Sequence, residues 1–213
     1  MKKIVFTIAL GLGLLTANAQ IQSLAGPRLG LVYISASPGS SFLNGDIRLE
    51  DTGDLPKDYN DIAKGALTTL YGWQWESRFA DGGNVTGIVE WIALVGGLEK
   101  GKFLPSVSSM VGARTASGIE FAVGPNLSLS GIAMVFGMGY NFKSGNLNIP
   151  VNIAFLPGRK GTSDAKYEWE SNSGPDGEWG TQDDVDEEVQ TQAPIDYNSG
   201  NRFSITVGFN LSK

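Results

Sequence analysis

Four closely spaced aspartates in the C-terminal third are the first residues whose types and spacing could do chemistry. Asp176, Asp183, Asp184 and Asp186 lie within residues 174–186, where glycines supply tight turns. Carboxylate oxygens held by such turns are the hard ligands that Ca²⁺ prefers. The spacing does not match the twelve-residue EF-hand loop. It leaves two interpretations, an irregular calcium site or a solvated acidic loop that binds no metal.

Glu76 and Glu90 are a second candidate set, because two neighbouring carboxylates can act as a general acid and a general base. A glycosidase holds such a pair at the mouth of a cleft, whereas both glutamates fall within predicted strands, among arginines. The chain contains no His and no Cys. This excludes the commonest general base, thiol nucleophiles, zinc–thiolate sites and disulfides. We predict no catalytic residue, no enzyme activity and no cofactor other than the calcium ion considered above.

Seven charged residues form a third set, because each falls in the same alternating phase as the small residues of its predicted strand. They are Arg28, Glu76, Arg78, Glu90, Arg114, Glu120 and Arg202. Four arginines against three glutamates predict an inward network of ion pairs, since charges removed from water need partners. What such a network does depends on the elements that position it.

Alternation with a period of two is the dominant pattern outside two acidic segments. In residues 203–211, for example, every second residue is large and apolar. Strict alternation predicts strands, and tight-turn signals at 81–83, 116–118 and 144–146 separate neighbouring strands. The predicted strands are residues 27–36, 65–80, 84–98, 103–115, 118–124, 131–142, 147–157 and 201–212.

These strands predict an all-β fold, an eight-stranded antiparallel up-and-down transmembrane β-barrel. The tight turns fall on alternate junctions, and broader connections at 37–64, 99–102, 125–130 and 158–200 occupy the others. Short turns at one end and longer loops at the other are typical of outer-membrane barrels. The longest connections are acidic, and within 158–200 the segments 167–170 and 188–192 could pair as a hairpin above the barrel.

The choice of which face points inward rests on the less apolar face of the strands. That face carries Gly, Ala, Ser, Thr and Asn, which suit the narrow interior of an eight-stranded barrel that side chains fill completely. The charged network is then a structural plug, and a gate or ion relay is the alternative. Large apolar side chains would face lipid, and the predicted outward aromatics are Tyr33, Tyr71, Trp73, Trp75, Trp91, Phe136, Tyr140, Phe142 and Phe155.

The start of the chain has the layout of a Sec signal peptide. Lys2 and Lys3 precede an apolar run at residues 4–15, which is too short to span a bilayer as a helix, and a small-x-small cleavage site ends at Ala19. We expect a signal peptide at 1–19, cleavage near Ala19, and one barrel domain at 20–213 in the cell outer membrane. The partners would be outer-membrane lipid, the barrel assembly machinery and an extracellular ligand. Nucleic acid is excluded, because it requires basic patches.

Four segments carry a resemblance to a known group of proteins. They read GPRLGLVYIS, LYGWQWESRF, GLEKGKFLPSVSSMVGARTASGIEFAVGPNLS and MGYNFKSGNLNIPVNIAFLPG, and they cover roughly two thirds of the mature chain. In these segments the chain resembles uncharacterised outer-membrane β-barrel proteins of the Bacteroidetes type. The resemblance implies a barrel and an outer-membrane location, and it implies no activity.

Three functions from different classes remain open on the sequence. The favoured one is a barrel scaffold with a structural or surface-interaction role, whose acidic outer loops 37–64 and 158–200 contact a partner outside the cell. The second is a narrow pore or carrier for small apolar molecules. The third is a soluble periplasmic lipid-binding β-barrel, which needs the opposite facing, with Phe203, Ile205 and Phe209 inward.

Overall fold

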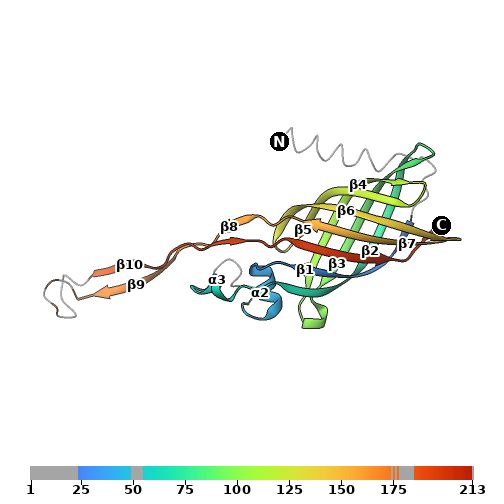
Figure 1. The fold of residues 1–213 in the computed structure, drawn as a ribbon. Helices are drawn as coiled ribbons and strands as arrows, with labels where there is room; N and C mark the ends of the chain where they lie inside the picture. Colours follow the sequence, from blue (N-terminus) through green and yellow to red (C-terminus); the bar gives the residue numbers. More distant parts are fainter. Residues whose placement is uncertain (1–23, 49–54, 174, 176, 178–184, 213) are drawn as a thin grey trace, which may run out of the picture.

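A closed barrel is the main body of the protein (Figure 1). The structure, a computed structural model, describes residues 24–48, 55–173, 175, 177 and 185–212. The barrel strands are β1 (Leu24–Ile34), β2 (Ala66–Asp81), β3 (Val85–Gly96), β4 (Leu104–Thr115), β5 (Ile119–Ser128), β6 (Gly131–Ser144), β7 (Leu147–Leu156), β12 (Arg202–Gly208) and β13 (Asn210–Ser212). The last two form one strand interrupted at Phe209, whose backbone N–H donates to the carbonyl of Pro27 at 3.1 Å.

Each barrel strand pairs antiparallel with its neighbour in sequence, and β1 pairs with both β2 and the β12–β13 strand. This pairing closes the sheet and confirms the predicted all-β, eight-stranded, up-and-down barrel. Closure also leaves no strand edge open, so the barrel backbone satisfies its own hydrogen bonds. Leu24 pairs with Ser212, which places both ends of the described barrel at the end of the tight turns.

One predicted connection, at 125–130, is wrong. β5 continues to Ser128, and only Leu129 and Ser130 separate it from β6. Gly124 and Pro125 read as turn residues, but here they interrupt only the pairing with β4, while the pairing with β6 continues through both. A proline cannot donate to a ladder, and a Cβ at Gly124 would lie 1.9 Å from the carbonyl oxygen of Ser109. Partners on β6 therefore keep the strand extended through residues that locally favour a turn.

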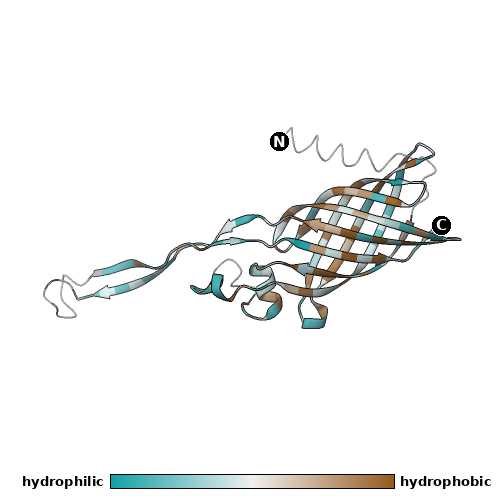
Figure 2. Cartoon of the chain, viewed as in Figure 1, coloured by the Kyte–Doolittle hydropathy of each residue, from teal (hydrophilic) through white to brown (hydrophobic). Residues whose placement is uncertain are grey.

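Hydrophobic and hydrophilic residues alternate along the barrel strands (Figure 2), and the large apolar side chains lie on the outer surface. Eight of the nine predicted outward aromatics are exposed, and Trp91 and Phe136 are 52% and 50% exposed. The ninth, Phe155, is half-buried because its ring packs on Phe203 with the centroids 4.7 Å apart. The predicted outward facing of the aromatics is thus correct. Phe203 itself is exposed, which contradicts the inward facing that a soluble lipid-binding barrel would need.

Two short helices and a 3-10 turn, η2 (Leu98–Lys100), lie at the end opposite the tight turns. Helix α2 (Pro38–Asn44) begins with a capping box between Ser37 and Ser40, which satisfies free backbone donors. Its Leu43 packs on Val32, Ile34, Ala66 and Leu70 inside the barrel rim. Helix α3 (Tyr59–Ile62) belongs to a separate apolar cluster of Ile47, Leu55, Tyr59 and neighbouring side chains. The first acidic loop therefore folds back over the barrel mouth.

The second acidic loop continues the barrel as a thin two-stranded arm (Figure 1). β8 (Lys160–Thr162) pairs with β11 (Asp196–Asn198), and β9 (Lys166–Asn172) pairs with β10 (Val185–Gln192). The predicted hairpin between 167–170 and 188–192 is confirmed, since Trp169 lies opposite Glu188. The expected signal peptide at 1–19 lies outside the described residues. In the described part of the chain, no helix has the length and apolar character needed to cross a membrane.

Candidate luminal binding site

The half of the lumen nearer the tight turns, called here the turn half, is closed by a cluster of buried charges. Arg114 on β4 donates to both carboxylate oxygens of Glu76 on β2, at 2.7 and 2.5 Å, and its Nε donates to Glu120 on β5. The strand register places these side chains together, because Arg114 lies opposite Glu120 across the β4–β5 ladder. A bidentate pair of this kind is the strongest geometry for an arginine and a carboxylate.

Arg28 and Gln74 extend this cluster across the barrel. The Nε of Arg28 donates to Gln74 Oε1 at 2.8 Å, and its Nη1 donates to Thr206 at 2.8 Å. The Nε2 of Gln74 in turn donates to a carboxylate oxygen of Glu90. Arg28, Glu76, Arg114, Glu90 and Glu120 are all buried. Two arginines against three glutamates, bridged by an amide, thus fill the turn half with side chains.

Of the other two predicted members of the network, the structure places Arg202 apart from the glutamates. Arg78 lies near the end of β2 and is partly buried. Arg202 lies at the opposite end of the barrel, where it contacts serine hydroxyls instead of the glutamates. The expectation that all four arginines and three glutamates form a single network is therefore wrong, because a shared phase puts residues on the same face but not at the same height.

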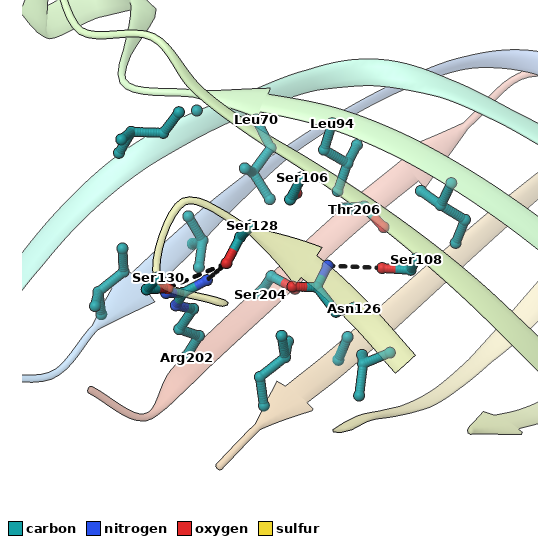
Figure 3. A pocket seen from close by; sticks show the side chains of 18 of the residues that line it. Leu70, Leu94, Ser106, Ser108, Asn126, Ser128, Ser130, Arg202, Ser204 and Thr206 are labelled. Carbon is teal, nitrogen blue, oxygen red and sulfur yellow. Dashed lines mark hydrogen bonds between the residues drawn. The ribbon is translucent and has the colours of Figure 1, made fainter. Parts of the chain in front are cut away.

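The half of the lumen nearer the loops, called here the loop half, contains a cavity of about 420 Å³ (Figure 3). Its walls include two groups of apolar side chains, one around Val32, Ile34 and Leu70 and the other around Ile92, Met110 and Val135. Glu90, Glu120 and Arg28 form its floor. The expectation that side chains fill the lumen completely is therefore wrong in the loop half.

A band of small polar side chains interrupts the apolar wall on one side. Asn126 donates to Ser108 at 2.9 Å, and Ser106 and Ser204 face the same cavity (Figure 3). Asn126 Oδ1 is buried and has no hydrogen-bond partner among the described residues. Mostly apolar walls with a few placed polar groups are the composition of small-molecule sites.

The mouth of the cavity is lined by Arg202 and the short β5–β6 turn. Arg202 Nη1 donates to Ser128 Oγ at 3.1 Å, and Nη2 donates to Ser130 Oγ. Arg159 approaches the same turn and donates to the carbonyl of Ser130 at 3.5 Å. Helix α2 lies on another side of the mouth and contributes Pro38, Gly39 and Phe42 to the lining. The loops therefore shape the entrance to the cavity.

The 3-10 turn beside the mouth is tied to β2 by one carboxylate. Glu99 accepts hydrogen bonds from Thr68 Oγ1 at 2.5 Å, from the Thr69 backbone N–H at 3.2 Å and from the Thr69 hydroxyl. Slight desolvation raises the pKa of Glu99, but these hydrogen bonds outweigh it and lower the pKa to about 2. In the loop above, burial and the nearby Tyr197 raise the pKa of Tyr59 to about 12.

The cavity and its arginine mouth are what sequence reasoning missed. The alternating pattern of the strands identifies the inward charged residues. The space between these residues depends instead on which strands face each other across the barrel. One signal was present in the sequence. In β1 the inward phase changes from Gly26, Arg28 and Gly30 to Val32 and Ile34 towards the loop end, so the inner face becomes apolar there.

The predicted calcium ligands fall mainly outside the described residues, where Asp176, Asp183 and Asp184 lie. Asp186 is described, and it accepts a hydrogen bond from Ser171 across the β9–β10 ladder at 2.6 Å. Among the residues that the structure describes, no group of three acidic side chains is arranged to hold a metal ion. The calcium site stays a prediction.

Glu76 and Glu90, the acid pair considered for catalysis, lie opposite each other on β2 and β3. Each is held in the floor by its own partner, Arg114 for Glu76 and Gln74 for Glu90. No protein-family model, curated protein or solved structure matches the chain. Evidence for the function of this chain therefore comes from the geometry of its lumen.

Proposed function

We propose that this protein is an outer-membrane β-barrel that binds a small, largely apolar molecule in the loop half of its lumen. The observation that carries the proposal is the cavity of about 420 Å³ with mostly apolar walls and a charged floor. Ligand sites commonly measure about 300–1,000 Å³, so the cavity has room for one small molecule. The floor of paired charges favours a dead-end binding site over an open pore.

The membrane part of the proposal rests on the outer face. Large apolar side chains are exposed on every barrel strand, including Leu31, Trp73, Val111 and Phe121. A continuous apolar belt of this kind is unfavourable in water, whereas a closed barrel with an apolar exterior is one of two backbones that a bilayer accepts. Barrel strands β1 to β7 have 10 to 16 residues each, and roughly 9–11 tilted residues cross the bilayer core. The two acidic loops would then face the outside of the cell.

Cell fractionation tests the membrane location. We expect the protein in the outer-membrane fraction, with heat-modifiable migration on a gel. Protease added to intact cells should cut only within 37–64 or 158–200. Recovery of the intact protein in the soluble periplasmic fraction would overturn this part of the proposal.

Ligand binding tests the cavity. The probe is 1-aminoanthracene, whose fluorescence rises in apolar sites, added to the folded protein in amphipol. The variant Ala154→Trp places a large side chain in the cavity, because Ala154 lines it. The matched control Ala93→Trp adds the same side chain to the outward phase of β3, where Trp91 is exposed. We expect Ala154→Trp to abolish the fluorescence rise and Ala93→Trp to keep it, and equal signals from both variants would refute binding in the cavity.

A second candidate function is a surface interaction through the arm. Tyr167 and Trp169 on β9 are 52% and 71% exposed, and they share one face of a two-stranded ribbon that no other element covers in Figure 1. Exposed aromatic side chains are enriched at protein interfaces. Deletion of residues 166–190 keeps Gln192 and Ile195, which contact the first acidic loop. This deletion should leave the barrel and the cavity intact and remove only such an interaction. Loss of the folded barrel on that deletion would show that the arm serves stability instead.

A further inference from the structure

We propose that the cavity binds an amphipathic acid, with the anionic group at Arg202 and Arg159 in the mouth and the apolar chain in the cavity below. The inference rests on the proposed luminal binding function and adds the chemical class of the ligand. It is carried by Arg202, which lines the mouth of the apolar cavity, and by Arg159, which contacts the same turn, because neither has a carboxylate partner among the described residues.

Arg202 places one positive charge at the mouth of the cavity. It lies at the start of β12 and reaches across the lumen to Ser128 and Ser130 in the β5–β6 turn (Figure 3). Serine hydroxyls accept its hydrogen bonds but are neutral, so they leave the positive charge of the guanidinium uncompensated. Arg202 is partly buried, and burying a charge without an opposite charge is costly, which favours an anion at this place.

Arg159 doubles the positive charge at the same turn. Its Nη2 donates to the carbonyl of Ser130, and a Cβ at Gly131 would lie 2.9 Å from that nitrogen. The two arginines lie close enough to repel each other electrostatically. Arg114 forms ion pairs with Glu76 and Glu120. Within residues 24–48, 55–173 and 185–212, by contrast, no carboxylate lies within salt-bridge distance of Arg159 or Arg202.

The lining also fixes the orientation of such a ligand. Arg202 lies opposite Ile34 on β1 and Leu156 on β7, so the apolar wall begins beside the guanidinium. At the other end of the cavity, Glu90 and Glu120 form part of the floor. Arg28 also lines the floor, but the two carboxylates outnumber it and repel an anionic group, whereas the arginines at the mouth attract it. The acid group therefore stays at the mouth and the chain points inward.

The experiment compares decanoate with decanol, which has the same chain length and no charge. Binding to the folded protein in amphipol is measured by isothermal titration calorimetry, for the wild type, Arg202→Gln, Arg202→Lys and Arg159→Gln. The control Lys143→Gln removes one positive charge at the opposite end of β6, outside the cavity. Heat-modifiable migration confirms that each variant is folded.

We expect the wild type to bind decanoate more tightly than decanol. Charge-assisted hydrogen bonds predict a loss of roughly tenfold or more in decanoate affinity for Arg202→Gln. A smaller loss is expected for Arg159→Gln, a partial recovery for Arg202→Lys and no change for Lys143→Gln. Decanol affinity should stay the same in every variant.

Two results would overturn the inference in different ways. In the first, decanol and decanoate bind equally well, with neither affinity changed by Arg202→Gln. In that case the mouth does not distinguish charged from neutral ligands, while the cavity still binds apolar molecules. If neither compound binds the wild type, and 1-aminoanthracene also fails to bind, then the luminal binding function is wrong and the inference falls with it.

Discussion

The two halves of the lumen are built by the same strands and the same alternation, yet they differ in what satisfies their arginines. In the turn half, Arg114 is held by two carboxylates. In the loop half, the partners of Arg202 among the described residues are the hydroxyls of Ser128 and Ser130. Arg114 therefore acts as a structural cross-link, whereas Arg202 keeps its charge for an anion. Arg28 also donates to neutral groups, those of Gln74 and Thr206, but the three glutamates of the cluster lie near enough to attract its charge. The charge of its partners, more than the depth of its burial, therefore distinguishes a structural arginine from a binding arginine.

The two halves of the lumen also differ in the volume of their inward side chains. The turn half places arginine, glutamate and glutamine side chains towards the axis, and these meet one another and fill the space. The loop half places Val32, Leu70 and Val135 there, which are shorter and cannot reach across to the opposite wall. Unlike the ion pairs of the turn half, the apolar wall makes no directional bonds that would close the gap.

The largest expected effect comes from the same substitution made in both halves. Arg114→Met leaves Glu76 and Glu120 buried without the arginine that donates hydrogen bonds to both, and breaking a buried pair costs about 3–5 kcal/mol. Arg202→Met removes a charge that has no carboxylate partner among the described residues, and it relieves repulsion with Arg159, so we expect a change within about 1 kcal/mol. Urea unfolding of the protein in lipid vesicles measures both free energies. Equal losses for the two variants would erase the distinction between the halves.

A second, smaller effect tests whether lipid surrounds both halves. Phe136 points outward from β6, between Val123 and Phe155 on its neighbours. Phe136→Arg should lower the free energy of unfolding by roughly 2–4 kcal/mol if this part of the wall faces the bilayer centre. The matched variant Phe142→Arg, nearer the tight turns on the same strand, should cost roughly 0–1 kcal/mol. Vesicle unfolding checks both, and two equal small costs would argue for water outside the barrel.

Most of the fold follows from the sequence because a strand leaves a local signal. Alternation and tight turns predict each strand near its observed place, and only the connection at 125–130 is wrong. There the local preference of Gly124 and Pro125 for a turn loses to pairing with Met134 and Val135 on β6. Such pairing depends on residues distant in the sequence, which a local pattern does not contain.

The candidate site is less predictable than the fold for the same reason. Alternation assigns Arg114 and Arg202 to the same inward face and treats them alike. Their partners come from other strands, since Glu76 lies 38 positions from Arg114 and Ser128 lies 74 positions from Arg202. The register of the closed barrel decides these meetings. Periodicity therefore predicts which residues point inward, but not what they meet or where space remains.

The smallest expected effect concerns the rim of the loop half, where Glu99 holds the 3-10 turn to Thr68 and Thr69. Its pKa of about 2 lies below the ordinary value of 4.5, so the carboxylate stabilises the fold above pH 4.5 and loses this contribution as the pH falls towards 2. Because Glu99 is exposed, solvent screens the interaction and the effect stays well below about 1 kcal/mol.

Hydrogen exchange of the rim amides measures this contribution. The backbone N–H of Gly97 donates to Thr68 Oγ1 at 2.9 Å, so it reports whether Thr68 and Glu99 still hold the turn. After correction for intrinsic exchange rates, protection at Gly97 should fall between pH 4.5 and 2 in the wild type. In Glu99→Gln it should be low and independent of pH, while Asp81→Asn at the opposite end should behave as the wild type. If Gly97 in Glu99→Gln still loses protection between pH 4.5 and 2, acid acts on the charged floor first. The two halves of the lumen would then be coupled.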